Sequence, residues 1–433
     1  MNIAIIGTGY VGLITGACFA EFGFNVTCVD NDEKKISKLK KGKVPFYEPG
    51  LEELLQNNIK AKRISFTSDI AKAVESSLVI FIAVGTPPRG DGSADMRHVE
   101  GVAREISNHI NSYKVIVTKS TVPVGTGEKI HKIISKHLKE NIDFDIASNP
   151  EFLREGAGIE DFMRPNRIVI GTSSERAAAI MRDLYKPLNL IEVPIVMTEV
   201  KTAELIKYAS NAFLATKISF INDLSKLCEA VGANVQTVAK AMGLDRRIGP
   251  KFLHAGPGYG GSCFPKDTLA ILQIAKQYDV ELGIIKSVVK ANEEQKERSV
   301  KKIKAAIGSL KNKTVCILGL SFKPNTNDIR EAPAIFIIEK LIKAGAKIRA
   351  FDPVAMNDAK AVFPDLTYCK DAYSAVRGSD AVVIVTEWNE FRNLDLNKIK
   401  KLAKGSFFFD LRNIYEPDNA RKAGLKYFSI GRT

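Results

Sequence analysis

The chain has 433 residues, of which 45% are apolar and 26% charged, and its formal net charge is +14. This length and composition predict a soluble globular protein with two or three domains. The positive charge allows an anionic partner, but the lysines occur in runs of at most two and no nucleic-acid recognition module or basic tail is visible. A generally basic surface is the preferred interpretation, and we expect no nucleic-acid partner.

Cysteine usage and hydropathy exclude several other classes of protein. The six cysteines lie far apart without a CxxC pair, and the five histidines have no metal-ligand spacing, so we expect free thiols, a reducing compartment and no metal. No stretch reaches 18 apolar residues, which predicts no membrane contact through a spanning helix. The apolar N-terminus is interrupted by glycines and has no basic region before it, unlike a signal peptide. We therefore expect a cytoplasmic protein.

The first part of the chain alternates strand and helix patterns. Residues 3–30 have the pattern of a βαβ unit, with the glycine-rich segment GTGYVG (7–12) between the first strand and the helix. Further strand and helix patterns follow in alternation at 78–84, 97–110, 114–120, 127–140, 144–150 and 167–171. Strands that alternate with helices predict a parallel, doubly wound sheet.

From about residue 200 the pattern becomes helical. Apolar residues recur at helical spacing for some thirty residues and the stretch ends at Gly232, which predicts a helix longer than is typical of globular proteins. Shorter helices are predicted at 235–243 and within 267–307. We expect this part to form a spine between two domains.

A second α/β unit begins near residue 313. Strand, helix and strand patterns repeat those of the first unit, and Asp352 follows its second strand as Asp30 does in the first unit. The predicted fold class is α/β, with two Rossmann-like doubly wound domains joined by a long central helix. We assign residues 1–199 to the first Rossmann-like domain, 200–307 to the central helical domain and 308–433 to the second Rossmann-like domain. Two such domains imply two nucleotide-containing ligands.

The segment GTGYVG predicts a dinucleotide site. Gly7, Gly9 and Gly12 form a GxGxxG motif with a strand before it, a helix after it and Asp30 at the end of the next strand. The first glycine permits the tight turn, the second lets a pyrophosphate approach and the third allows close helix packing, while Asp30 accepts a hydrogen bond from a ribose 2′-hydroxyl and favours NAD over NADP. The alternative is a glycine turn that holds no ligand.

Other candidate residues follow strand ends or share a helix face. Thr86 and the segment Ser120–Pro123 follow strands, where turn chemistry alone is the alternative, and Glu151 and Glu155 are candidate acid–base or ribose-contacting groups or else solvated loop carboxylates. On the long helix, one face carries residues spaced i, i+3 and i+7, as an ordinary surface also would; they are Glu204, Lys207 and Asn211.

The stretch GYGGSCFPKD (258–267) contains a candidate nucleophile. Its three glycines leave the backbone free to approach a ligand, and Lys266 and Asp267 can tune the Cys263 thiol or a bound water. Four of the other cysteines stand in apolar runs typical of small buried residues. A buried structural role for Cys263 is the alternative.

Seven segments together carry a family resemblance. They are GTGYVG, KSTVPVGT, SNPEFLREG, ELIKYASNAFLATKISFIN, RRIGPKFLHAGPGYGGSCFPKD, LGLSFKPNTNDIRE and the C-terminal YFSIGR. In this order the chain resembles the UDP-glucose/GDP-mannose dehydrogenase family from its first residue to its last segment. The motif SCFPKD is similar to the form found in members that act on UDP-glucose, whereas His254 stands where other members carry lysine.

The resemblance implies an NAD-binding domain, a central helix for packing of a homodimer, and a C-terminal UDP-sugar domain. The catalytic residues it implies are Cys263 as nucleophile, with Lys207, Asn211, Asp267, Thr121 and Glu151. The NAD contacts it implies are Gly7, Gly9, Tyr10, Val11, Gly12, Asp30, Lys35, Thr86, Thr121, Glu155, Lys266 and Arg330. The contacts with UDP-glucose it implies are Phe152, Leu153, Arg154, Glu155, Lys207, Asn211, Arg247 from a neighbouring subunit, Phe252, Leu253, Gly260, Lys323 and Arg412.

The activity that the resemblance implies is the four-electron oxidation of UDP-glucose to UDP-glucuronate by two NAD, through a thiohemiacetal and a thioester on Cys263. A sister dehydrogenase for GDP-mannose or a UDP-N-acetylhexosamine is one alternative. A non-catalytic nucleotide-binding regulator, suggested by the positive charge, is another.

Overall fold

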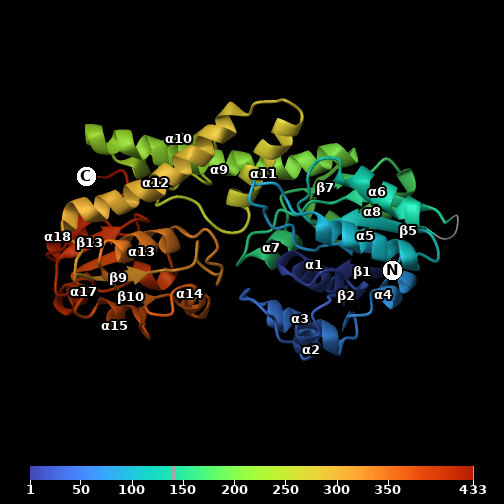
Figure 1. The fold of residues 1–433 in the computed structure, drawn as a ribbon, viewed down its shortest axis with the longest axis horizontal. Coiled ribbons are helices and arrows are strands. Elements are labelled where there is room, and N and C mark those ends of the chain that lie inside the picture. The colour runs from blue at the N-terminus through green and yellow to red at the C-terminus, as the bar shows by residue number, and fades with distance from the viewer. Residues whose placement is uncertain (139–141, 433) are drawn as a thin grey trace. The chain divides into compact units, whose positions relative to one another are not determined.

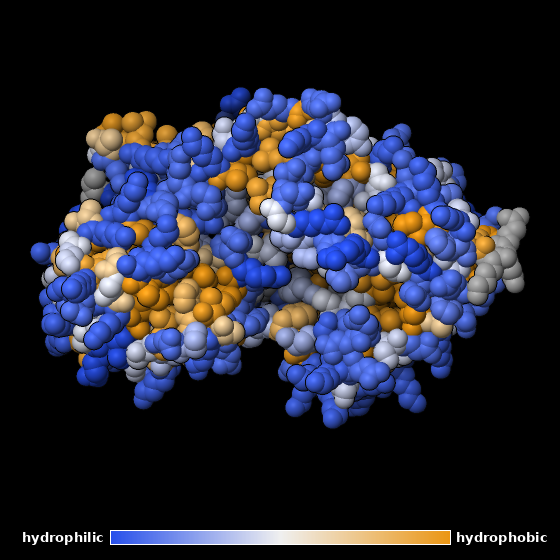
Figure 2. Space-filling model, in the orientation of Figure 1, coloured by the Kyte–Doolittle hydropathy of each residue, from blue (hydrophilic) through white to orange (hydrophobic). Residues whose placement is uncertain are grey.

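The structure is a computed structural model that describes residues 1–138 and 142–432. The chain divides into two compact units, Met1–Ser210 with Gln273–Asp279, and Asn211–Leu272 with Val280–Thr433. Figure 1 shows helices and strands in each unit, and Figure 2 shows that hydrophilic residues cover most of the visible face.

The first unit contains an eight-stranded sheet. Its strands are β1 (Asn2–Ile6), β2 (Asn25–Val29), β3 (Ile64–Thr67), β4 (Val79–Ile82), β5 (Lys114–Thr118), β6 (Phe144–Ser148), β7 (Ile168–Gly171) and β8 (Ile195–Thr198). Its helices are α1 (Tyr10–Glu21), α2 (Glu33–Lys40), α3 (Leu51–Lys60), α4 (Ile70–Ser76), α5 (Arg97–His109), α6 (Thr126–His137), α7 (Gly158–Met163), α8 (Glu175–Tyr185) and the 3-10 helix η1 (Lys186–Ile191). The strand order β3-β2-β1-β4-β5-β6-β7-β8 contains the doubly wound order of a dinucleotide-binding fold.

Alternation along β1 gives this sheet a core on each face. Ile3 and Ile5 pack with residues of α1, whereas Ala4 and Ile6 pack with residues of α5 and α6. Successive side chains of a strand point to opposite faces, so a fully apolar strand buries both. The helix pattern at 127–140 gives α6, and its residues 139 and 140 lie outside the described residues.

The sheet is parallel as predicted except where β7 meets β6, and there the prediction is wrong. β7 pairs with β6 in antiparallel fashion, and β8 is parallel to β7. The link between β6 and β7 contains one short helix, the six-residue α7, which spans about 9 Å and is too short to return the chain across the sheet. The strands β3 and β8 were also not anticipated by the sequence patterns.

The structure confirms the helices predicted from residue 200 onward. α9 is a single helix of 32 residues (Val200–Val231), followed by Gly232 with φ +74°. The other helices of this part are α10 (Val235–Leu244), α11 (Phe264–Gln277) and α12 (Gly283–Ile307). None of the described helices is long and apolar enough to span a membrane.

The second unit contains a six-stranded parallel sheet in the order β11-β10-β9-β12-β13-β14. Its strands are β9 (Thr314–Leu318), β10 (Lys347–Phe351), β11 (Thr367–Tyr368), β12 (Ala381–Ile384), β13 (Phe407–Asp410) and β14 (Lys426–Ser429). Its further helices are α13 (Pro333–Lys343), α14 (Met356–Val362), α15 (Ala372–Val376), α16 (Asn389–Arg392), α17 (Leu396–Leu402) and α18 (Pro417–Lys422). This order matches that of the first six strands, which confirms a second Rossmann-like sheet.

Asp352 follows β10 as Asp30 follows β2, as the sequence predicts. Its carboxylate is fully buried and accepts hydrogen bonds from the backbone N–H groups of Leu320 and Ser321, at 2.8 and 3.1 Å, and from the Trp388 indole at 3.1 Å. Asp352 is therefore occupied in holding the turn after β9 in place.

Candidate functional site

The glycine-rich turn after β1 has the geometry that its sequence predicts. Gly7 has φ +105°, and a Cβ there would lie 2.7 Å from the carbonyl oxygen of Ala83. A Cβ on Gly12 would collide with the carbonyl oxygen of Gly7. Gly9, by contrast, has no heavy atom of the described residues within 4 Å of its Cβ position. The turn itself therefore requires two of the glycines, and Gly9 leaves the backbone open to a phosphate.

Asp30 follows β2, and one of its carboxylate oxygens accepts three hydrogen bonds. Its Oδ2 accepts hydrogen bonds from the backbone N–H and the hydroxyl of Thr8, at 2.9 and 2.6 Å, and from Lys35 Nζ at 2.8 Å. Asp32 caps α2 by accepting from the Lys35 N–H, which places Lys35 in the first turn, within reach of Asp30. Burial raises the pKa of Asp30, but Lys35 and Thr8 outweigh it and hold the pKa at about 2.

A pocket of about 680 Å³ lies along this turn and is lined by residues including Gly7, Gly9, Asp30, Lys35, Pro87 and Arg97. It combines an exposed peptide backbone at a helix N-terminus, an ionised carboxylate whose Oδ1 has accepting capacity left, and basic side chains. These groups fit the pyrophosphate and the adenosine ribose of NAD. Thr86 lies beside the pocket and donates from its hydroxyl to the Thr121 carbonyl oxygen at 2.9 Å.

The loop after β6 presents Glu151 to Lys207 of α9. Lys207 Nζ donates to Glu151 Oε1 at 2.8 Å, and Glu151 Oε2 accepts from the Leu153 N–H at 2.6 Å. The Lys207 and Glu151 side chains are 4% and 6% exposed. Burial raises the pKa of Glu151, but the Lys207 ammonium and the Leu153 N–H outweigh it, so the pKa lies below its usual value. The pair is a buried cation and carboxylate, a combination suited to oxyanion stabilisation and proton transfer.

The residues that the i, i+3, i+7 spacing places on one face of α9 are buried, although an exposed face would have the same spacing. Glu204 is 2% exposed and accepts hydrogen bonds from the backbone N–H groups of Gly125 and Gly127, at 2.6 and 2.8 Å. Burial raises the pKa of Glu204 to about 7, although the two N–H donors act in the opposite direction. Glu204 thus fixes the start of α9 against the loop that follows Thr121, one turn before Lys207.

Cys263 stands directly before α11 in the second unit. All six cysteines are free thiols; Cys263 is partly exposed, whereas the other five are buried. The Asp267 N–H donates to the Cys263 carbonyl oxygen at 2.8 Å, so Asp267 lies one helical turn beyond the thiol. Asp267 is 1% exposed, and its Oδ1 accepts from Lys266 Nζ at 2.6 Å. A partly exposed thiol with a lysine in the helical turn that follows it is compatible with a nucleophile.

The glycines before Cys263 are required by the packing of the second unit itself. Gly261 has φ +83°, and a Cβ there would lie 2.7 Å from the Phe322 ring, while a Cβ on Gly260 would collide with the Glu331 carbonyl oxygen. A Cβ on Gly258 would lie 3.0 Å from Asn292 Oδ1. The sequence interpretation assigned these glycines to the approach of a ligand, and the structure gives this additional reason for them.

Three buried amides that the sequence interpretation missed hold this loop. Asn292 of α12 accepts from the Tyr259 N–H at 2.8 Å and donates to the Tyr259 carbonyl oxygen at 3.1 Å. Asn222 of α9 accepts from the Gly256 N–H at 2.8 Å, and Gln295 donates to the Gly256 carbonyl oxygen at 2.7 Å. Amides on a helical pattern give no signal of this role, because their partners are backbone groups of a distant loop.

Several predicted contact residues already form ion pairs inside their own unit. Arg154 pairs with Asp161, Arg247 with Asp245 and Arg330 with Asp328, at 2.6, 2.7 and 2.8 Å. The side chain of Arg247 is 89% exposed and that of Arg330 66% exposed, so both can turn towards a ligand. Each pair is a surface ion pair of small energy.

The remaining predicted contacts vary in exposure. Arg412 Nε donates to the Val385 carbonyl oxygen at 2.6 Å. Leu253 is 3% exposed in the second unit's core, next to Phe252 with φ +67°. The others are at least partly exposed: Tyr10, Val11, Phe152, Leu153, Glu155 and Lys323. Across residues 1–138 and 142–432, no group of three or more His, Cys, Asp or Glu side chains could hold a metal ion.

The dinucleotide turn, its pocket and the second Rossmann-like sheet define an NAD-dependent dehydrogenase with a second nucleotide domain. Residues 1–189 match the NAD binding domain of the UDP-glucose/GDP-mannose dehydrogenase family, residues 201–294 its central domain and residues 316–417 its UDP binding domain. The chain belongs to this family and is an NAD-dependent oxidoreductase.

Individual relatives match along their whole length. The chain is 52% identical to a UDP-glucose 6-dehydrogenase of Rhizobium meliloti (strain 1021), over 100% of both chains. It resembles the structure of a UDP-glucose dehydrogenase from the hyperthermophilic archaeon Pyrobaculum islandicum with a TM-score of 0.93 and 38% identity, covering 100% of this chain and 98% of that one. A UDP-D-ManNAc dehydrogenase from Pyrococcus horikoshii gives a TM-score of 0.87 and 27% identity, covering 100% and 99%.

Proposed function

We propose that the protein oxidises UDP-glucose to UDP-glucuronate with two molecules of NAD and one of water, releasing two NADH and three protons. The observation that carries the proposal is the environment of Cys263, a partly exposed thiol before α11 among five cysteines that are buried. The high identity to a UDP-glucose 6-dehydrogenase, compared with 27% to the UDP-D-ManNAc enzyme, supports UDP-glucose as the sugar nucleotide.

A thiol is needed because the oxidation removes four electrons in two hydride steps. The first hydride leaves C6 of the sugar for NAD as the hydroxyl loses its proton, and an aldehyde results. The Cys263 thiolate adds to the aldehyde carbon, and the thiohemiacetal formed is again an alcohol that can give up a hydride. Loss of that second hydride to NAD leaves a thioester, and water then displaces the thiolate to give the carboxylate.

The charged groups of the site suit the remaining steps. We assign Lys207 and Asn211 to the oxyanions that develop on the reacting carbon, because a buried ammonium and an amide N–H stabilise negative charge. Asp267 and Thr121 would handle the attacking water and its proton, and Glu151 would assist hydrolysis. The buried pair of Lys207 and Glu151, at 2.8 Å, supports a shared role of these two groups.

The binding residues divide between the two ligands. For NAD we propose Gly7, Gly9, Tyr10, Val11, Gly12, Asp30, Lys35, Thr86, Thr121, Glu155, Lys266 and Arg330. For UDP-glucose we propose Phe152, Leu153, Arg154, Glu155, Lys207, Asn211, Phe252, Leu253, Gly260, Lys323, Arg412 and, from a second copy, Arg247.

The NADH yield tests this function. With limiting UDP-glucose and excess NAD, we expect two NADH per sugar nucleotide at completion, followed by absorbance, and UDP-glucuronate as the product. UDP-N-acetylmannosamine and GDP-mannose supplied in the same way should give little NADH. A yield of one, or faster turnover of another sugar nucleotide, contradicts the assignment. A protein that binds both nucleotides without forming NADH would instead be a regulator.

We also propose that the protein is a homodimer packed along α9. Phe213, Phe220 and Leu227 of this helix are 65%, 50% and 56% exposed and repeat every seven residues. That spacing places all three on one stripe, as in helices that pair along an apolar seam. Light scattering should give the mass of a dimer for the wild type and that of a monomer for Phe220→Glu; an unchanged mass excludes this seam.

A further inference from the structure

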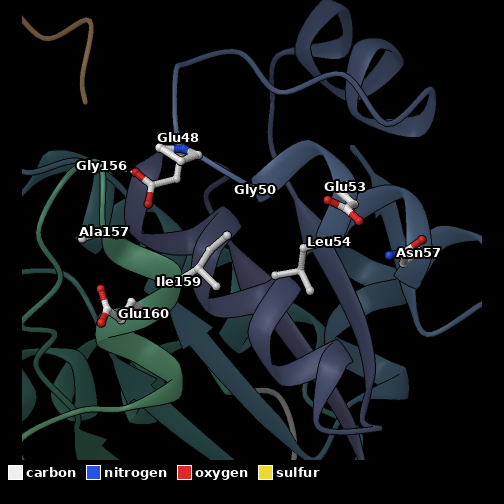
Figure 3. A pocket seen from close by; sticks show the side chains of 10 residues that line it. Glu48, Gly50, Glu53, Leu54, Asn57, Gly156, Ala157, Ile159 and Glu160 are labelled. Carbon is white, nitrogen blue, oxygen red and sulfur yellow. Dashed lines mark hydrogen bonds between the residues drawn. The ribbon is translucent and has the colours of Figure 1, made fainter. Parts of the chain in front are cut away.

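Glu48 is a buried carboxylate that none of the sequence motifs contains. It precedes α3 in the first unit, is 7% exposed, and borders a pocket of about 530 Å³ between α3 and α7. Figure 3 shows the Glu48 side chain at the end of this pocket beside Gly156, whereas Glu53 of α3 lies farther along it. Burial of a carboxylate on the lining of this pocket needs a reason.

The Glu48 carboxylate binds the loop that follows β6. Its Oε2 accepts a hydrogen bond from the Gly156 N–H at 2.6 Å and its Oε1 one from the Gly158 N–H at 2.7 Å. These charge-assisted bonds fix both ends of the peptide segment 156–158. The same loop carries Glu151, which Lys207 holds at its other end.

Glu48 also binds the dinucleotide turn. The Tyr10 hydroxyl lies 2.8 Å from Glu48 Oε2 and 2.9 Å from the Arg154 carbonyl oxygen, and donates towards both. Tyr10 is the first residue of α1, directly after Gly9. Burial, followed by the charge of Glu48, raises the pKa of Tyr10 far above its usual range, so the hydroxyl keeps its proton and remains a donor.

These two segments pack closely against each other. A Cβ on Gly158 would lie 2.5 Å from the Tyr10 hydroxyl, so the loop sits directly on the tyrosine. A shift of Tyr10 must therefore move either the Glu48 carboxylate or the Gly156–Gly158 backbone. Such a contiguous set of buried hydrogen bonds can transmit the effect of one ligand to the binding of another.

We propose that Glu48 is a positioning residue that couples the NAD turn to the 149–158 loop, so that a bound dinucleotide tightens the binding of the sugar nucleotide. The inference rests on the proposed function in one respect, the assignment of the 152–155 backbone to UDP-glucose. Coupling of this kind suits a reaction in which the dinucleotide is exchanged while the sugar stays bound. Each dinucleotide that binds would return the 149–158 loop to the position that holds the sugar nucleotide.

The coupling is measured by calorimetric titration of UDP-glucose into the enzyme with and without saturating NADH, a combination that does not turn over. In the wild type, NADH should lower the Kd of UDP-glucose by about fivefold or more, within the usual range for linked sites. In Glu48→Gln one backbone N–H would face an amide donor, and the ratio of the two Kd values should fall below about twofold. Glu53→Gln, at an exposed carboxylate on the same pocket, should keep the wild-type ratio.

A second variant separates coupling from a simple loss of fold. Tyr10→Phe removes the hydroxyl and keeps the ring; it should lose the coupling as Glu48→Gln does, and the double variant should lose no more. A ratio near one in the wild type, a ratio kept in Glu48→Gln, or additive effects of the two substitutions would each overturn the proposal. Because binding is measured, a chain that binds UDP-glucose without oxidising it fails the proposed function yet still tests Glu48. If UDP-glucose does not bind, the same titration with UDP gives the answer.

Discussion

Asn211 of α9 donates a hydrogen bond of 2.6 Å from Nδ2 to Oδ2 of Asp267 on α11, and both side chains are almost completely buried. The other carboxylate oxygen of Asp267 accepts from Lys266 Nζ, also at 2.6 Å. Both oxygens of a buried carboxylate one turn beyond Cys263 are therefore held by donors. An amide that holds Asp267 in place can also offer its remaining N–H to a developing oxyanion.

The first prediction concerns this hydrogen bond. Asn211→Ala removes both the donor to Asp267 and the amide available to the substrate, so kcat should fall by about 100-fold, the usual cost of one such donor. Asn211→Asp keeps the volume but places a carboxylate 2.6 Å from Asp267. One of the two must then bind a proton, and activity should fall further as the pH rises.

Steady-state NADH formation between pH 6 and 9 measures both effects. Thr216→Val, on the same helix, is the control, because the Thr216 hydroxyl donates only to the Ala212 carbonyl oxygen inside the helix. Wild-type kcat in Asn211→Ala would show that Asn211 has no part in the chemistry.

Most of the fold could be predicted from the sequence because the patterns that indicate it are local. GxGxxG with Asp30, the fully apolar strands and the long periodic stretch ending at Gly232 each require neighbouring residues alone, and all three were confirmed. The direction of β7 was predicted wrongly, because it depends on how far α7 carries the chain, which no periodic pattern records.

The site could be predicted in part. Cys263 stands out by its neighbours in the sequence and is partly exposed, whereas the helical spacing of Lys207 leaves a surface position open and the structure buries it. Glu48 and Asn292 did not stand out, because each binds backbone groups far along the chain, 108 residues away for Glu48 to Gly156 and 33 for Asn292 to Tyr259. Contacts between a side chain and a distant peptide leave no spacing to detect.

The second prediction concerns Cys263. Cys263→Ala should form no UDP-glucuronate, because no thiol is present to return the aldehyde to the alcohol level, while NADH binding should stay within about twofold of the wild type. Product analysis by chromatography and NADH fluorescence measure the two properties. Cys228→Ala, at a buried thiol, is the control and should keep its activity. Acid formed at the wild-type rate by Cys263→Ala would exclude the thioester route.

The third prediction concerns the choice of dinucleotide. Asp30→Ser removes the carboxylate that accepts from a ribose hydroxyl and repels a 2′-phosphate, and leaves Lys35 without its ion-pair partner. The kcat/KM for NAD should fall by about tenfold, and the ratio of NADP to NAD use should rise by about 100-fold, since two interactions of about 1.4 kcal/mol each change. Parallel assays with the two dinucleotides measure this. An unchanged ratio would show that Asp30 does not face the ribose.

The last prediction is a pH dependence of stability that arises from Lys119. This side chain is 4% exposed, and its Nζ donates to Asn149 Oδ1 at 2.9 Å. Burial lowers its pKa from 10.5 to about 7, with Glu151 acting in the opposite direction and Lys207 in the same direction. At pH values between about 7 and 10.5, Lys119 carries a proton in the unfolded chain but not in the folded chain. The free energy of unfolding therefore gains from this lysine as the pH rises, by at most about 1.4 kcal/mol per pH unit.

Lys119→Met isolates this effect, because it keeps the length of the side chain and removes the titration. Asn149 Oδ1 still accepts a hydrogen bond from the Tyr185 hydroxyl at 2.5 Å, so this oxygen keeps a hydrogen-bond partner in the variant. At pH 7.5 the variant should be about 1–4 kcal/mol more stable than the wild type, because folding of the wild type must remove a proton from Lys119 and methionine has none to lose, and the difference should shrink towards pH 9.5. Urea unfolding at several pH values measures it, with exposed Lys132→Met as the control. A difference that stays constant with pH would mean that Lys119 keeps its proton in the folded protein.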